Sequence, residues 1–229
     1  MSKKVEDIKI DKIIRSKRKT ISLEVTKDGK LVVRAPYLVP RSQIESLVRS
    51  KESWIRKKQE LVRVRSQEVS SKKYVNGEMF WYLGNSYVLE LVNDQEEPLV
   101  LKHRFYLDGE FQNKGRMIFE DWYKNRASEV INNRVRKQAR RNGFSFSRVR
   151  ITSAKTRWGS CGPKGSLNFT WRLVMAPLEV VDYVVAHELV HLKIRNHSKK
   201  YWNELSALMP DYEQYRLWLK ENGHRLTLD

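Results

Sequence analysis

The sequence lacks paired cysteines, long apolar runs and an even balance of charge. Its one cysteine, Cys161, cannot form an internal disulfide, which is typical of proteins from reducing compartments. No run approaches the roughly 18 apolar residues that a membrane-spanning helix needs, and residues 1–10 lack the apolar core of a secretory signal. We therefore expect a cytoplasmic protein without a membrane partner.

Acidic residues are scarce relative to basic ones. The chain has 45 Lys and Arg against 27 Asp and Glu, a net charge of +18. Residues 1–72 carry 20 basic and 9 acidic side chains and residues 113–157 carry 13 and 3, whereas residues 158–229 are nearly neutral. A solvated basic surface is the default explanation, and a nucleic-acid partner is the alternative.

The N-terminal half reads as strands and a basic helix. Alternating apolar residues at 20–25 and 31–35 flank Asp28-Gly29, a strong hairpin signal. Apolar positions between about 40 and 62 then repeat at helical spacing, with Arg and Lys around the rest of the helix. Short strands separated by turns follow up to residue 107. We expect residues 1–112 to form a β-rich region with a basic helix.

The C-terminal half alternates helices and strands. A long helix is predicted from about Gly115 to Arg141, because its apolar residues repeat at three and four and Asn142-Gly143 can end it. Strands follow at 148–152 and 165–173, then helices to about residue 221. The fold class is therefore α+β. We expect residues 113–229 to form a second domain, and one continuous domain is the alternative.

Histidine is also rare, with five residues, yet three of them fall within eleven positions. His187, Glu188 and His191 form the pattern H-E-x-x-H on a predicted helix. Residues four apart share a helix face, so the two imidazoles can bind one ion. Zinc accepts neutral imidazole, and its catalytic sites usually have three protein ligands and an open position.

The third ligand must come from outside this helix face. His197 is the natural candidate, but six residues past His191 it lies off the ligand face unless the helix ends first. Asn196 tolerates the left-handed conformation that closes a helix, and Ser198 is a good N-cap for a new one. His197 would then sit at a corner between two helices.

Three motifs together resemble a known family. The segment Arg157-Trp158-Gly159-Ser160-Cys161, the strand 167–173 and the segment from His187 to Trp202 are similar to the YgjP-like zinc-dependent metallopeptidases, relatives of the SprT-like proteins. The resemblance covers most of the chain. It implies a zincin-like fold, in which a mostly antiparallel sheet packs on an active-site helix after an N-terminal β-hairpin and helix.

The resemblance also implies roles for particular residues. His187, His191 and His197 would bind Zn²⁺, and Glu188 would be the general base. The spacing also matches the metzincin pattern, which has glycine where this chain has Ile194, and another branch uses a downstream glutamate, for which Glu204 is the candidate. Arg157 and Tyr201 are candidates for contacts to the substrate or transition state, with a structural ion pair as the alternative for Arg157.

The sequence is compatible with two functions. The first is a peptidase that hydrolyses a peptide or protein through a metal-activated water, with the substrate extended along an edge strand near residues 165–172. The second is a nucleic-acid-binding protein with a structural or secondary metal centre. Cys161 could be a ligand or nucleophile, but a buried small residue is the more common role of such a cysteine.

Overall fold

The computed structural model of the protein describes residues 8–26, 28–68 and 71–229. The chain divides into two compact units, residues 1–70 and residues 71–229. Each described unit has a hydrophobic core of its own. The predicted domain boundary at 112/113 therefore falls inside the second unit.

The first unit is a three-stranded sheet with two helices. Its elements are β1 (Lys12–Ser16), β2 (Ser22–Val25), β3 (Leu31–Pro36), α1 (Arg41–Ser50) and α2 (Glu52–Glu68). The predicted hairpin is present: β2 and β3 pair antiparallel around Gly29, whose φ of 78° suits glycine. The predicted basic helix is split at Lys51. Leu31, Val33 and Ile44 are fully buried between sheet and helix.

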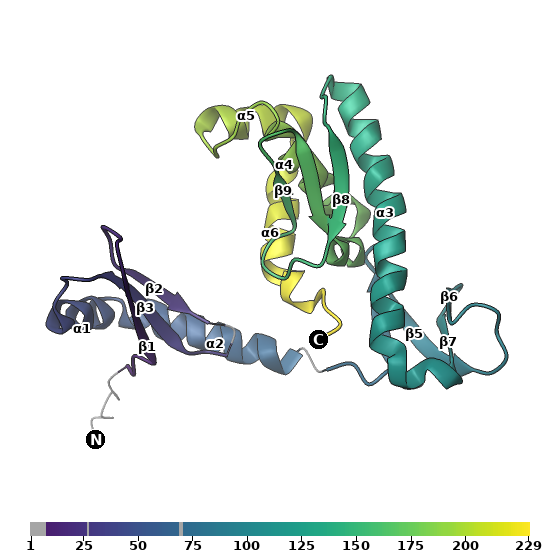
Figure 1. The fold of residues 1–229 in the computed structure, drawn as a ribbon, viewed down its shortest axis with the longest axis horizontal. Helices are drawn as coiled ribbons and strands as arrows, with labels where there is room; N and C mark the ends of the chain where they lie inside the picture. The colour runs from purple at the N-terminus through teal and green to yellow at the C-terminus, as the bar shows by residue number, and fades with distance from the viewer. Residues whose placement is uncertain (1–7, 27, 69–70) are drawn as a thin grey trace. The chain divides into compact units, whose positions relative to one another are not determined.

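The second unit holds the remaining elements (Figure 1). The strands are β4 (Met79–Tyr82), β5 (Asn85–Val92), β6 (Leu99–Leu101), β7 (Phe105–Asp108), β8 (Arg148–Thr152), β9 (Gly159–Cys161) and β10 (Ser166–Thr170). The α-helices are α3 (Gly115–Asn142), α4 (Leu178–Val190), α5 (Lys199–Leu208) and α6 (Tyr212–Asn222), with short 3-10 turns η1 (Gly109–Lys114), η2 (Trp171–Met175) and η3 (Gly223–Arg225). The α+β class is confirmed.

The long helix α3 explains why the unit boundary lies before β4. Its buried residues recur every four positions from Gly115 to Ala139, and this stripe packs against η2, α4 and β8. The sheet β4-β5-β7-β6 adds its apolar side chains to the same core, since Phe80 of β4 stacks on Phe119 of α3 with ring centroids 4.0 Å apart. Residues 71–112 therefore belong with the C-terminal half.

The sheet beside α4 is mixed rather than mostly antiparallel. Its strand order is β8-β10-β9, with β10 parallel to β8 and antiparallel to β9. The central position of β10 corrects the expectation that residues 165–172 form an edge strand, because both sides of β10 are already paired. The edge strand in contact with α4 is β9.

Helix α4 is enclosed by the other elements of this unit. It contacts α3, η2, β9, α5 and α6, and it is apolar around nearly its whole circumference, as a buried helix must be. Among the described residues, no helix is both long and apolar enough to cross a membrane.

Candidate metal centre

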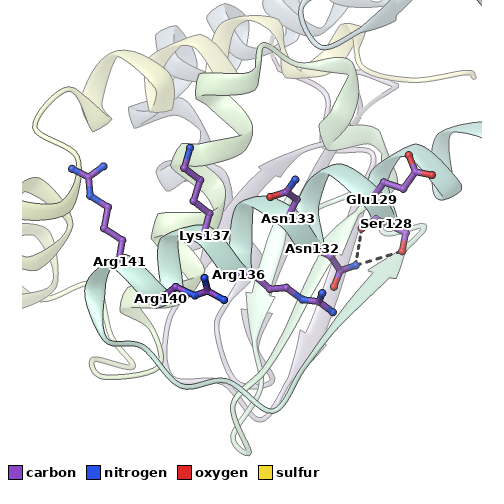
Figure 2. A pocket seen from close by; sticks show the side chains of 8 residues that line it. All are labelled: Ser128, Glu129, Asn132, Asn133, Arg136, Lys137, Arg140 and Arg141. Atoms are coloured by element: carbon purple, nitrogen blue, oxygen red, sulfur yellow. Dashed lines mark hydrogen bonds between the residues drawn. The ribbon is translucent and has the colours of Figure 1, made fainter.

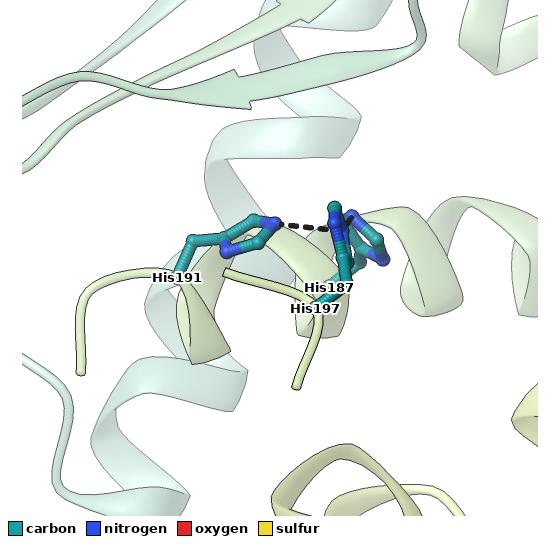
Figure 3. A group of neighbouring side chains, drawn as sticks. All are labelled: His187, His191 and His197. Atoms are coloured by element: carbon teal, nitrogen blue, oxygen red, sulfur yellow. Dashed lines mark hydrogen bonds between the residues drawn. The ribbon is translucent and has the colours of Figure 1, made fainter. Parts of the chain in front are cut away.

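Three histidines converge where α4 ends and α5 begins (Figure 3). His187 lies in the last turn of α4, His191 is its C-cap residue, and His197 precedes the first turn of α5. The Nε2 atom of His197 lies 3.1 Å from that of His191 and 3.2 Å from that of His187. Among the described residues, they form the one cluster of His, Cys, Asp or Glu side chains placed to share an ion.

The corner between the two helices differs from the expected one. Helix α4 stops at Val190, and a tight turn follows in which the Ile194 amide donates to the Val190 carbonyl. Asn196 does not adopt the left-handed conformation expected of it; its side-chain oxygen accepts from the Ser198 amide at 3.3 Å. The helix therefore closes five residues earlier, and this gives His197 enough chain to fold back.

The histidine geometry fits zinc. A tetrahedral ion at about 2.0–2.1 Å from each nitrogen would hold the nitrogens about 3.3 Å apart, close to the 3.1 Å and 3.2 Å that separate Nε2 of His197 from the other two, and all three ligand atoms lie within 4.8 Å of one another. The Nδ1–H of His191 can donate to the Ile194 carbonyl at 3.0 Å, which leaves the Nε2 lone pair for a metal. Burial, together with the neighbouring His191 and His197, lowers the pKa of His187 to about 3. Neutral imidazole is the form that binds metal.

Tyr201 packs against His191 and binds the backbone of His187. It is fully buried, its ring lies 4.6 Å from that of His191, and its hydroxyl donates to the backbone carbonyl of His187 at 3.1 Å. Burial raises its pKa well above the ordinary range, so the hydroxyl stays protonated. With this hydroxyl buried and engaged, Tyr201 positions the ligand helix, and its contact to a substrate stays a prediction.

Glu188 is a buried carboxyl beside the histidines. The residue is only 4 % exposed, and its Oε2 atom makes no hydrogen bond to any described residue. Burial raises its pKa to about 8, and the positive charge of Arg157 opposes that shift. A buried carboxyl without a hydrogen-bond partner lowers the stability of the folded protein unless a bound molecule or ion contacts the unpartnered oxygen.

Gly159 contacts the candidate site in a way that the sequence did not predict. A Cβ atom at this position of β9 would lie 2.6 Å from Oε1 of Glu188, so only glycine lets the strand pass this close to the carboxyl. A glycine inside a strand often marks such a close approach, and that signal was present in the Trp158-Gly159-Ser160 motif.

The remaining candidates lie around this centre. Arg157 is exposed and lines a second pocket of about 210 Å³, which does not include the histidines. Cys161 is partly buried, and burial raises its thiol pKa, which disfavours the thiolate that a ligand or nucleophile needs. Glu204 lies outside the histidine cluster and forms an ion pair with Lys193 at 3.2 Å, so the structure brings His197 rather than Glu204 to the other two histidines.

A pocket of about 310 Å³ opens beside the centre. Its walls come from α4, from α6 and from the segment that leads into β9. His187 and Glu188 both line it, so a molecule in this pocket would lie next to the histidine cluster.

Comparison with known proteins identifies the family of the chain. No curated protein matches the chain. Among solved structures, the metallopeptidase zymogen of Methanocaldococcus jannaschii jannalysin matches with 23% identity, over 40% of this chain and 95% of that one, with a TM-score of 0.37. The metallopeptidase zymogen of Pyrococcus abyssi abylysin matches with 19% identity, over 40% and 93%, with a TM-score of 0.36. The model of the family described as YgjP-like, metallopeptidase domain, matches residues 19–222, and the chain therefore belongs to this family of metallopeptidases, which are hydrolases.

Proposed function

We propose that the protein is a cytoplasmic zinc peptidase in which His187, His191 and His197 bind the metal and Glu188 is the general base. The observation that carries this proposal is the convergence of three imidazole nitrogens next to a buried carboxyl whose Oε2 has no hydrogen-bond partner in the described part of the chain. When bound, zinc supplies Lewis acidity, which polarises a carbonyl and lowers the pKa of water to about 7.

Glu188 moves the proton in this proposal. Its Oε2 accepts a proton from the attacking water, and the same carboxyl then donates that proton to the nitrogen of the leaving amine. Its buried surroundings favour this exchange, because a carboxyl whose pKa lies near neutrality can both take up and release a proton. Gly159 keeps β9 against the carboxyl, and Tyr201 holds the backbone of His187.

The substrate would lie extended along β9. Since β9 is the edge strand in contact with α4, a peptide that pairs with its free side passes close to Glu188. This replaces residues 165–172 as the docking strand, because β10 has no free edge.

The test is removal and return of the metal. We expect the purified protein to contain one zinc per chain, and treatment with a chelator should abolish cleavage of a mixed set of unfolded proteins and peptides. One equivalent of zinc should restore it, with new termini identified by mass spectrometry. Folded, zinc-loaded protein that cleaves none of these substrates would refute the proposal, as would cleavage that is unchanged without metal. Glu204→Gln, outside the cluster, is the matched control and should behave as wild type.

A specific surface favours a second candidate function, nucleic-acid binding. A hollow of about 930 Å³ runs along one side of α3 and is lined by Arg136, Lys137, Arg140 and Arg141 together with the polar residues Ser128, Glu129, Asn132 and Asn133 (Figure 2). Clustered cations with amide side chains suit a phosphate backbone. Part of this charge also has a structural role, because cations at the C-terminal turns of a helix are favoured by its dipole.

A further inference from the structure

The pocket beside the histidines has one wall made by α6. Helix α6 contributes Arg216, Leu219 and Lys220, and α4 contributes Tyr183 alongside His187 and Glu188. Leu219 and Tyr183 are 8 % and 6 % exposed, so the apolar part of the wall is packed. The proposed function does not use the residues of α6, yet they border the place where a substrate group next to the scissile bond would lie.

Trp158 closes the pocket on the side of β9. Its Cζ2 atom would lie 2.7 Å from a Cβ at Gly223, so the indole packs directly against the backbone at the end of α6. This contact fixes the distance between the Trp158 wall and the α6 wall. Trp158 and Tyr183 both line the pocket, so part of its lining is aromatic.

Arg216 supplies a positive charge to the wall of this pocket. Its guanidinium carbon lies 4.9 Å from the centre of the Trp202 ring, and stacking on an aromatic face restricts the side chain. Arg216 lines the pocket together with His187 and Tyr183. Lys220 follows one turn later on the same wall.

The pocket is short of negative charge. Among the described residues that line it, Glu188 is the one carboxyl, and in the proposed mechanism Glu188 is occupied with the proton of the attacking water. A substrate group that enters this space therefore meets aromatic walls and at least one cation. Arginine binds a carboxylate through two parallel hydrogen bonds and binds neutral groups more weakly. An anionic substrate group fits these walls best.

We propose that Arg216 makes this pocket a carboxylate-binding subsite, so that the enzyme selects peptides with a carboxylate next to the scissile bond. The inference rests on the proposed peptidase function. The carboxylate could belong to an acidic side chain or to the C-terminus of a peptide, and both sources present the same chemistry to a guanidinium.

The experiment compares peptides that differ only in one carboxylate. One pair has Glu or Gln beside the scissile bond and an amidated C-terminus. A second pair has a neutral sequence that ends in a free acid or an amide. Cleavage is measured as kcat/KM with zinc-loaded wild type and with Arg216→Met, which keeps an unbranched apolar stem and removes the charge. Arg148→Met, an exposed arginine on β8 that does not line the pocket, is the matched control.

We expect wild type and Arg148→Met to prefer the acidic member of at least one pair by about tenfold or more. Arg216→Met should lose this preference and cleave the neutral peptides within about twofold of wild type. A preference confined to the first pair identifies a side-chain carboxylate, and one confined to the second identifies a C-terminal carboxylate. Equal kcat/KM within both pairs for wild type, or equal slowing of acidic and neutral peptides by Arg216→Met, would overturn the inference.

A binding measurement separates this inference from the proposed function. The Glu188→Gln variant should bind the same peptides without turning them over, and the dissociation constants should show the same preference for the acidic member. Adding Arg216→Met to this variant should remove the preference. If wild type cleaves no peptide but the variant still binds the acidic peptides more tightly, the peptidase proposal fails and the subsite stands. If wild type cleaves the peptides but neither assay shows a preference for the acidic member, the peptidase proposal stands and the carboxylate subsite is overturned.

Discussion

At the scale of single residues, Glu188 can be separated from the metal ligands. It neighbours His187 in sequence, but its carboxyl is buried beside the histidine cluster, which contains only imidazoles among the described residues. Glutamine has the same shape and cannot act as a base. We expect Glu188→Gln to fold, to keep its zinc and to lose at least about a hundredfold in turnover, since general acid–base catalysis typically contributes 10²–10⁴-fold.

Zinc content and turnover should be measured on the same preparation of Glu188→Gln. A metal-free variant would make Glu188 a ligand or a structural residue. A metal-loaded variant with normal turnover would end the mechanism proposed above.

Gly159 gives a second prediction at this scale. A Cβ atom here would lie 2.6 Å from Oε1, 2.7 Å from Cγ and 2.9 Å from Cδ of Glu188, so Gly159→Ala must displace this carboxyl; the clash involves none of the three histidines, and we expect the variant to fold and bind zinc. The displaced carboxyl should lower kcat by roughly 10- to 100-fold, because small misplacements of a catalytic group are costly. Gly162→Ala, whose new methyl would meet the Ser166 side chain instead, is the matched control.

The double variant distinguishes positioning from general damage. If Gly159 acts through Glu188, then Gly159→Ala should have little further effect on turnover in the Glu188→Gln background. Effects that multiply in the double variant would contradict a positioning role.

Contacts between residues close in sequence could be predicted, whereas contacts between residues far apart in sequence could not. His187 and His191 were predictable because helical periodicity places residues four apart on one face. The approach of Gly159 to Glu188, and of Arg216 to the same pocket, joins residues 28 or more positions apart, and no local pattern encodes such contacts. Tyr201 was singled out by its motif, but its burial under His191 depends on how α5 packs against α4.

At the scale of elements, the turn between α4 and α5 decides the third ligand. The turn brings the imidazole of His197 to the other two histidines and leaves Glu204 paired with Lys193. Loss of a ligand's outer-shell partner typically weakens metal binding by about 10–100-fold, so loss of a ligand should exceed that. We expect His197→Ala to weaken zinc binding by at least about a hundredfold and Glu204→Ala to leave it unchanged.

Competition with a chromophoric zinc chelator measures both affinities. Full zinc affinity in His197→Ala together with loss in Glu204→Ala would show that the ligand assignment is wrong. Circular dichroism of the two variants controls for unfolding of α5.

The bounds of the elements were predicted well where periodicity and end signals agree. Helix α3 runs from Gly115 to Asn142, as its apolar spacing indicated, and Gly143 ends it with a φ of 66°. The end of α4 was misplaced, because the residues of the turn after Val190 carry no glycine or proline signal. The break at Lys51 was missed for the same reason. The position of β10 inside its sheet depends on which strands pair with it, β8 on one side and β9 on the other, and no pattern within β10 itself encodes that choice.

At the scale of the whole molecule, the proposed peptidase function does not account for the excess of positive charge. Its densest described cluster within the second unit lines the hollow on α3, whose residues do not line the pocket beside the histidines. The two surfaces can therefore be tested independently. Net charge alone also attracts polyanions, so a test must separate the position of the charges from their number.

Charge reversal at Arg136, Lys137, Arg140 and Arg141 provides that test when it is paired with a control of equal charge. The control reverses Arg148, Arg150, Lys199 and Lys200, which are exposed and do not line the hollow.

Each phosphate contact contributes about 0.9 to the slope of log affinity against log salt. If the hollow binds a phosphate backbone, the first variant should lose affinity for duplex DNA and reduce that slope by up to about four, while the control should retain most of both. Fluorescence anisotropy over a salt series measures the slope, and zinc-dependent cleavage of a short neutral peptide should be unchanged in both variants. Equal loss of DNA binding in the two would assign the effect to net charge, and loss of peptide cleavage in the first variant alone would place the hollow within the path of the substrate.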